Sequence, residues 1–224
     1  MGFLKNLDRV KIHPLLNPEI SKDGYLELDL SVSNEELQKV DVSSSDKLHR
    51  YIWDYLKDNN AQVAFGGYLE QRAIYRRSKH FNESNPLTER NIHLGIDLWL
   101  DAYEPIFAPL DGSIHSFRNN TNFGDYGPTL ILKHTLEEKI FYTLYGHLSL
   151  NSLTDKKTGN SVRAGQQIGT LGSSEENGDY PPHLHFQIIY DLQGFEGDYP
   201  GVCSQLDVDF YKENCPDPNL LLRL

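Results

Sequence analysis

Pro181-Pro182-His183-Leu184-His185-Phe186 opens a run of apolar and histidine residues that extends to Tyr190. Aromatic and β-branched residues over such a length, bounded by turn residues, are typical of a β-strand. Side chains two positions apart on a strand point to the same side. His183 and His185 therefore share one face of this strand, whereas Leu184 and Phe186 face the core.

The chain before this strand contains further short apolar runs separated by turns. The turns include Pro109-Leu-Asp-Gly112, Asp125-Tyr-Gly-Pro128 and Thr158-Gly-Asn160. Regular short strands with this punctuation predict a mainly β fold, either an all-β sandwich or a barrel. The predicted strands cover residues 95–100, 106–108, 113–117, 129–133, 140–145, 167–171 and 183–190.

The first 62 residues have a different pattern from the rest of the chain. Residues 24–31 alternate between apolar and polar side chains like a half-buried strand, and residues 45–57 carry apolar residues at helical spacing behind a serine-rich start. We therefore predict a mixed strand-and-helix N-terminal extension over residues 1–62, with no evident role, and one domain over residues 63–224.

Composition and charge exclude several classes of partner. A chain of 224 residues with 38% hydrophobic and 11% aromatic residues predicts a folded globular protein without a membrane-inserted helix. The formal net charge of -11 disfavours nucleic acid as a partner. No secretory signal is visible at the N-terminus, which leaves the compartment open. Cys203 and Cys215 could pair, but without a secretory context we expect free thiols.

Two more histidine-bearing motifs accompany the strand at His183. They are His93-Leu-Gly-Ile-Asp97 and Tyr145-Gly-His147-Leu148. The even spacing of His93 and Asp97 allows both side chains to converge on one site. Zinc favours imidazole nitrogen and carboxylate oxygen, and a catalytic zinc site keeps three protein ligands and a water. Two histidines and one aspartate meet that count, and two histidines remain for proton transfer or for a hydrogen bond to an oxyanion.

Each histidine also has a structural interpretation. A single histidine on a strand is usually a surface residue or a hydrogen-bonded core residue. His115 and His134 have no second partner within a motif, and we interpret both as structural.

Taken together and in order, these motifs resemble the lysostaphin-type, or LytM-like, zinc metalloendopeptidases, a family of bacterial peptidoglycan hydrolases. No single motif is specific, but their ordered combination is. The resemblance runs from about Arg90 to Ile188 and rests on residues 90–97, 104–114, 145–149, 162–169 and 183–186.

The resemblance implies a fold, a zinc site and a reaction. The implied fold is an antiparallel β-sandwich or hybrid barrel, a duplicated hybrid motif, with a groove between the loops after Phe117 and Gly172. The implied zinc ligands are His93, Asp97 and His185, and no other cofactor is implied. The implied catalytic residues are His147 and His183, one acting on a zinc-activated water and the other on the tetrahedral intermediate. The implied substrate is a peptide, such as a peptidoglycan cross-link.

Some features depart from the family pattern or stay open. Gln187 stands where many members carry glutamate. Lysostaphin-like relatives also use a tyrosine upstream of the first ligand, and either Tyr68 or Tyr75 could supply it. The oligomeric state is not indicated.

Two other functions stay open. A catalytically silent scaffold of the same fold would bind wall peptides or regulate a partner, but such a scaffold is expected to lose ligands or catalytic histidines, and none is missing. A phosphocarrier-like hybrid barrel shares the pattern of residues 108–112 and 162–166, but its motifs come in another order and do not use the pair His183 and His185.

Overall fold

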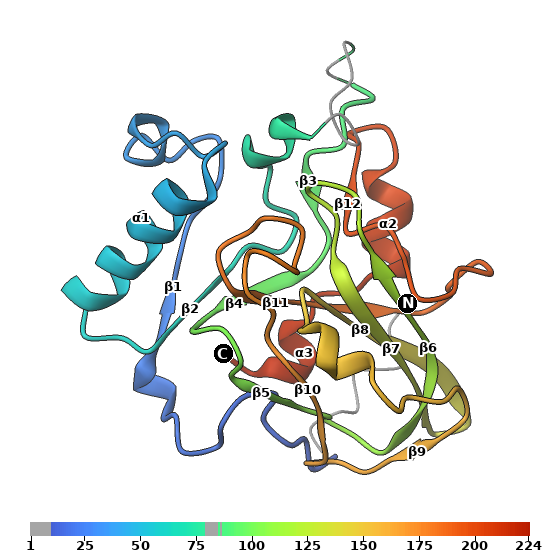
Figure 1. Cartoon of the computed structure of the whole chain (residues 1–224). Coiled ribbons are helices and arrows are strands. Elements are labelled where there is room, and N and C mark those ends of the chain that lie inside the picture. The colour runs from blue at the N-terminus through green and yellow to red at the C-terminus, as the bar shows by residue number, and fades with distance from the viewer. Residues whose placement is uncertain (1–9, 79–84, 86) are drawn as a thin grey trace.

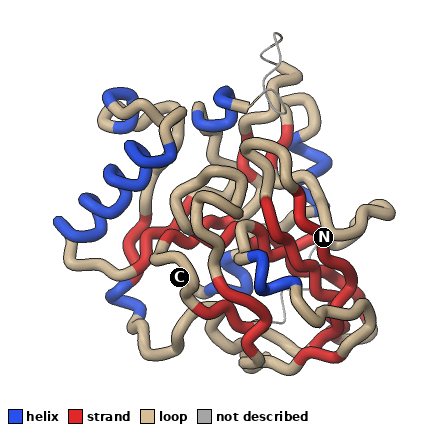
Figure 2. Tube along the Cα trace, viewed as in Figure 1, coloured by secondary structure: helices blue, strands red, loops and turns tan. Residues whose placement is uncertain are grey.

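The computed structural model describes residues 10–78, 85 and 87–224 and shows a mainly β protein (Figure 1). Within this part of the chain, one sheet of eight strands forms the centre, and two pairs of short strands flank it. The helices lie around the strands, as Figure 2 shows. None of the helices in the described residues is both long and apolar enough to span a bilayer.

The elements follow one another along the chain with these bounds: β1 (Tyr25–Glu27), α1 (Ser45–Asp58), β2 (Val63–Gly66), η4 (Ile74–Arg77), β3 (Ile92–His93), β4 (Ile96–Trp99), β5 (Pro105–Phe107), β6 (Gly112–Asn120), β7 (Gly127–Leu136), β8 (Lys139–Gly146), η5 (Leu150–Leu153), β9 (Ser161–Val162), β10 (Gln167–Thr170), β11 (His183–Ile189), β12 (Val202–Cys203), α2 (Val208–Asn214) and α3 (Asn219–Leu222). Two further single turns of 3-10 helix are η2 (Lys22–Gly24) and η3 (Leu37–Lys39).

The strand order of the large sheet is β1-β2-β4-β11-β8-β7-β6-β9. Neighbouring strands run antiparallel except for β1 and β2, which are parallel and make the sheet mixed. The prediction of a mainly β fold is confirmed, and each of the seven strands predicted beyond residue 90 overlaps a strand of the structure.

Strand β11 lies in the middle of this sheet and is buried along its whole length. The side chains of Leu184, Phe186 and Ile188 are completely buried in the main hydrophobic core. Full burial of three large apolar side chains on one face stabilises the strand by several kcal/mol, at about 1.5 to 3 kcal/mol each. The alternate residues His183, His185 and Gln187 occupy the other face, and this core therefore fixes where the histidines point.

The N-terminal extension contains the predicted helix and a strand. Ser44 caps α1 by accepting a hydrogen bond from the amide of Lys47, and the helix buries Leu48, Ile52 and Leu56. The strand is shorter than the predicted residues 24–31. It ends after Glu27 because the Asp29 carboxylate accepts a hydrogen bond from the Ser31 amide, which turns the chain out of the ladder.

In space the extension continues the large sheet. Strand β1 pairs with β2 over Tyr25 to Glu27, and the buried face of α1 packs in one cluster with Ile74, Trp99 and Tyr180. The division at residue 62 stays a prediction about chain organisation, but residues from both sides of it contribute to one sheet.

His134 shows the cost of a buried neutral histidine. It is 1% exposed, its Nδ1 lies 2.9 Å from the Asp111 carbonyl oxygen, and its Nε2 lies 2.8 Å from Thr143 Oγ1. Burial lowers the pKa of His134 below its usual value of 6.5. The unfolded chain therefore takes up a proton near pH 6.5 that the folded chain does not, so acid favours unfolding.

We expect the free energy of unfolding of the metal-free protein to fall as the pH is lowered from about 7 to about 5. His134→Gln removes one group of this kind, and its stability should depend on pH less steeply, by up to about 1.4 kcal/mol per pH unit. Urea denaturation at several pH values measures both slopes. Identical slopes for the two proteins would contradict the role given to His134.

Candidate metal centre

Three side chains from separate strands meet at one point of the sheet. His93 lies at the end of β3, Asp97 in β4 and His185 in β11, where His185 is directly opposite Asp97 in the antiparallel ladder. His93 Nε2 lies 2.9 Å from His185 Nδ1, and both nitrogens lie 3.2 Å from Asp97 Oδ1. All three residues are at most 3% exposed.

Hydrogen bonds on the outer side of each histidine determine which ring nitrogen carries the proton. His93 Nδ1 donates to the Gly67 carbonyl oxygen at 3.1 Å, and His185 Nε2 donates to Gln187 Oε1 at 2.9 Å. These acceptors have no proton to give, so His93 Nε2 and His185 Nδ1 present lone pairs. Burial lowers the pKa of His93 to about 3, which keeps that ring neutral at physiological pH.

These atoms fit a zinc ion. Two imidazole lone pairs and a carboxylate oxygen converge with no proton between them, an arrangement that a divalent cation stabilises. Tetrahedral zinc with bonds of about 2.0 to 2.1 Å needs ligand atoms about 3.3 Å apart. The separations of 2.9 to 3.2 Å come close to that value. Among the described residues, this trio is a group that could hold a metal ion.

A buried arginine supports the aspartate. Arg72 Nη1 donates to Asp97 Oδ2, and Arg72 Nε donates to Glu70 Oε2, with the arginine side chain 3% exposed. Glu70 Oε1 in turn accepts a hydrogen bond from the Leu30 amide in the N-terminal extension. Burial by itself raises the pKa of Asp97, but His93 and Arg72 outweigh it and hold the pKa well below its usual value. Asp97 is therefore ionised, with Oδ1 directed at the histidines.

His147 and His183 lie beside the trio and form a second pair. Their ring centroids are 4.2 Å apart, and His183 Nε2 lies 3.9 Å from Asp97 Oδ1. His147 Nδ1 donates to the Asn177 carbonyl oxygen and His183 Nδ1 to that of Pro181, each at 2.7 Å. Burial lowers the pKa of both histidines. Each Nε2 is therefore unprotonated and able to take a proton.

Two backbone positions make this packing feasible. Gly95, between His93 and Asp97, allows the ring of His185 to approach, because a Cβ there would lie 2.6 Å from His185 Cε1. His147 has a φ of 61°, in the left-handed region that non-glycine residues rarely adopt. Such strain is typical of residues that the surrounding structure holds in place for function.

The trio and the second histidine pair line one cavity of about 320 Å³. These five residues are His93, Asp97, His147, His183 and His185. Its walls include Asp125 and Tyr126 from the loop after β6, and Tyr180 and Pro181 from the loop after β10. These two loops are the ones that the family resemblance implied as groove walls. The five residues are at most 5% exposed, so the cavity encloses them closely.

The structure adds residues that motif analysis missed. Arg72, Trp99, Tyr126 and Tyr180 line the cavity, and the Tyr126 hydroxyl lies 3.3 Å from His185 Nε2. Of the two candidate tyrosines, Tyr75 also lines the cavity. Tyr68 instead donates its hydroxyl to the Cys215 carbonyl oxygen and does not line it. No motif marks these residues, although Tyr180 directly precedes the Pro-Pro-His motif.

Gln187 positions His185 from the face of β11 that both residues share. Its Oε1 accepts a hydrogen bond from His185 Nε2. Its Nε2 donates to the Pro200 carbonyl oxygen and to Cys215 Sγ, each at 3.2 Å. Cys215 and Cys203 are both buried free thiols, as expected. Gln187 is thus held by two partners and keeps the His185 ring oriented with Nδ1 toward His93 and Asp97.

Gln187→Leu should weaken zinc binding by about 10- to 100-fold, because it removes the acceptor that orients His185. Gln187→Glu keeps an acceptor at this position, so this variant should bind zinc about 10- to 100-fold more tightly than Gln187→Leu. Competition with a chromophoric zinc chelator measures both affinities. Equal affinities for the leucine and glutamate variants would show that the hydrogen bond has no such role.

Comparisons with known proteins give a family match and several relatives. Residues 91–196 match the family described as "Peptidase family M23". The peptidoglycan DD-endopeptidase ShyC of Vibrio cholerae is 30% identical over 136 residues, which are 59% of this chain and 29% of that protein. An uncharacterized metalloprotease of Haemophilus influenzae is 30% identical over 121 residues, which are 54% of this chain and 23% of that protein.

One of the solved structures that match part of this chain is a peptidase domain. The catalytic domain of the antimicrobial peptidase lysostaphin from Staphylococcus simulans is 27% identical, with a TM-score of 0.37, and the match covers 55% of this chain and 80% of that chain. The match to the curated relatives spans less than a third of their length.

Proposed function

Residues 91–196 belong to peptidase family M23, and from this we propose that the chain is a zinc-dependent metalloendopeptidase that hydrolyses peptide bonds. The observation that carries the proposal is the meeting of three lone-pair atoms, from His93, Asp97 and His185, beside two neutral histidines in one cavity. We also infer that the sheet is the hybrid barrel of lysostaphin-type peptidases, which the order of the motifs supports.

The roles of the residues follow from their tautomers. His93 Nε2, His185 Nδ1 and Asp97 Oδ1 would hold the ion. When bound, zinc supplies Lewis acidity toward water and toward a peptide carbonyl. His147 and His183 act at their Nε2 atoms. One takes a proton from the attacking water and passes it to the leaving nitrogen, and the other takes up a proton from solvent and then donates a hydrogen bond to the developing oxyanion.

The proposed substrate class is peptidoglycan cross-links or peptides derived from the cell wall. The support is the similarity to a protein named peptidoglycan DD-endopeptidase. The complete set of ligands and paired histidines offers no support for a silent scaffold. A phosphocarrier does not use the pair His183 and His185, and both of these residues line the cavity, so the site offers no support for that function either.

The test combines metal analysis with digestion. We expect the purified protein to bind one zinc per chain, to release fragments from defined cross-linked wall peptides, to lose this activity on chelation and to regain it with zinc. A protein without stoichiometric zinc would contradict the metal site. A zinc-loaded protein that cleaves no wall peptide would contradict the enzymatic proposal and favour the scaffold.

A further inference from the structure

Part of the cavity wall is apolar and comes from the N-terminal extension. Leu30 and Leu48 line it from the extension, and Ile74, Trp99 and Tyr180 line it from the rest of the chain. These five residues belong to one hydrophobic cluster, and each is at most 8% exposed. A surface of this composition accepts an apolar group and rejects a charged one.

The apolar wall begins directly at the candidate catalytic pair. The ring of Trp99 stacks on His183 with centroids 5.7 Å apart and an interplanar angle of 21°. Tyr180 contacts both histidines edge-on, with centroids 5.7 Å from His183 and 5.1 Å from His147. A group held against Trp99 and Tyr180 therefore lies next to the bond that the histidines would act on.

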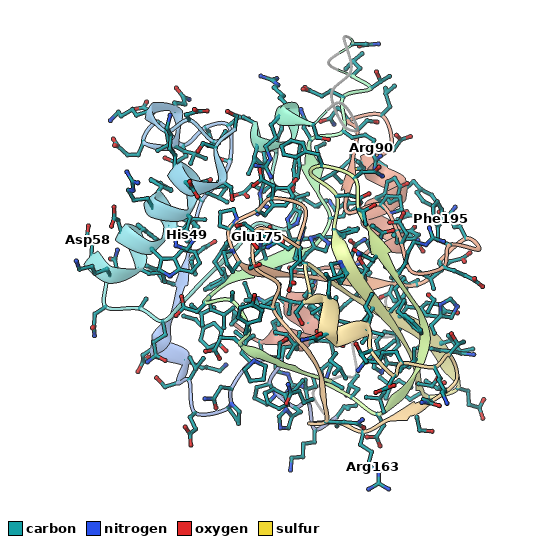
Figure 3. All side chains as sticks on the ribbon, in the orientation of Figure 1. His49, Asp58, Arg90, Arg163, Glu175 and Phe195 are labelled. Atoms are coloured by element: carbon teal, nitrogen blue, oxygen red, sulfur yellow. The ribbon has the colours of Figure 1, made fainter. Side chains whose placement is uncertain are left out.

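Two arginines lie close to this wall, and each is already paired. Arg77 lies with its Cζ 4.2 Å from the centroid of Tyr180, and its Nη1 donates to Asp179 Oδ2 at 3.3 Å. Arg72 lies with its Cζ 5.6 Å from the centroid of Trp99, but its Nη1 and Nε donate to Asp97 and Glu70. The charged residues Arg90, Asp125 and Asp198 line the cavity together with Phe195. In Figure 3, Phe195 and α1, which His49 and Asp58 mark, lie on opposite sides of the view.

We propose that Leu30, Leu48 and Ile74, with Trp99 and Tyr180, form a pocket for a large aliphatic or aromatic side chain of the substrate, beside the scissile bond. The extension thereby selects peptides with such a residue over peptides with only small residues. This rests on the proposed function, which makes the peptide the occupant of the cavity. A side chain of the size of leucine should raise kcat/KM at least about 10-fold over glycine at the same position.

Helix α1 offers a matched pair of variants. Leu48 and Leu56 both lie on its buried face, at 2% and 6% exposure, but Leu48 lines the cavity and Leu56 does not. The substrates are two series of wall-type peptides that differ only in leucine or glycine on one or the other side of the cleaved bond. Leu48→Phe fills the pocket and should reduce the leucine-to-glycine ratio of kcat/KM toward one, whereas Leu56→Phe should keep the wild-type ratio.

A second substitution tests the same pocket in the opposite direction. Ile74→Ala enlarges it and should shift the preference from leucine toward phenylalanine. Circular dichroism and thermal melts show whether each variant is folded. A ratio that is near one in the wild type, or equal in the Leu48→Phe and Leu56→Phe proteins, would overturn the proposal.

Binding of small probes tests the pocket without any turnover. The chain has two tryptophans, Trp53 and Trp99, so Trp53→Phe leaves Trp99 as the single tryptophan, whose fluorescence is excited selectively over that of tyrosine. We expect N-acetyl-leucinamide to change this fluorescence with a Kd at least about 10-fold lower than that of N-acetyl-glycinamide. Tighter leucine binding in a protein that cleaves nothing would support the pocket and contradict the proposed function. Equal responses to the two probes would overturn the pocket alone.

Discussion

His185→Ala should lose bound zinc, whereas His183→Ala should keep zinc and lose turnover. The first variant removes one of the three converging lone pairs, and we expect zinc affinity to fall by at least about 100-fold, more than the loss of a supporting hydrogen bond costs. The second variant removes only a proposed general acid–base group, and its loss should lower kcat by about 100- to 10,000-fold. Metal analysis after dialysis, with peptide hydrolysis in parallel, measures both effects.

The structure provides the reason why two histidines two residues apart differ so much. His185 Nδ1 lies 3.2 Å from Asp97 Oδ1 and His183 Nε2 lies 3.9 Å from it, and the ring of His183 packs between Trp99 and Tyr180. His115→Ala, outside the cavity, is the control and should retain both zinc and activity. Zinc loss in His183→Ala with retention in His185→Ala would reverse the assignment.

Arg72→Leu should destabilise the protein by about 3 to 5 kcal/mol, because it leaves two buried carboxylates without their partner. The side chains of Asp97 and Glu70 are 3% and 11% exposed, so water cannot replace the guanidinium. Urea denaturation of the metal-free protein measures the loss. Arg72→Lys keeps a charge but cannot reach both carboxylates with the same geometry. Its free energy of unfolding should therefore lie between those of the wild-type protein and Arg72→Leu.

Arg163 is the matched control for Arg72. It is exposed, as its label at the edge of Figure 3 shows, and Arg163→Leu should change stability by no more than about 0.5 kcal/mol. A loss below about 1 kcal/mol for Arg72→Leu would mean that the ion pairs with Asp97 and Glu70 contribute little.

Six of the eight strands of the large sheet could be predicted because their sequence pattern is local, whereas β2 and β9 were not predicted. Period-two alternation places Leu184 and Phe186 in the core and His183 and His185 on the opposite face, and the structure shows both. The spacing of His93 and Asp97 likewise indicated a shared site. Turn residues between the runs defined the predicted strands to within a few residues, apart from the 24–31 strand. There the alternation of burial persists, with Leu28 and Leu30 buried, but the strand itself ends at Glu27.

The parts that could not be predicted depend on contacts between distant residues. Nothing local indicates that Arg72 pairs with Asp97, or that Leu48 of a helix in the extension lines the same cavity as His183. The parallel pairing of β1 with β2 joins the extension to the sheet, and strand pairing is a property of tertiary packing. Motif analysis therefore identified candidate ligands but not the groups that surround them.

The pairing of β4 with β11 brings together Asp97 and His185, which are 88 residues apart. A contact of that separation costs loop-closure entropy, and we expect it to form after the more local strand pairs of the sheet. During synthesis, a chain that has only reached residue 184 contains His93 and Asp97 but not His185. With two of the three candidate ligands, it should bind a cation weakly. We therefore expect zinc binding, and with it any hydrolytic activity, to appear only once the sheet is complete.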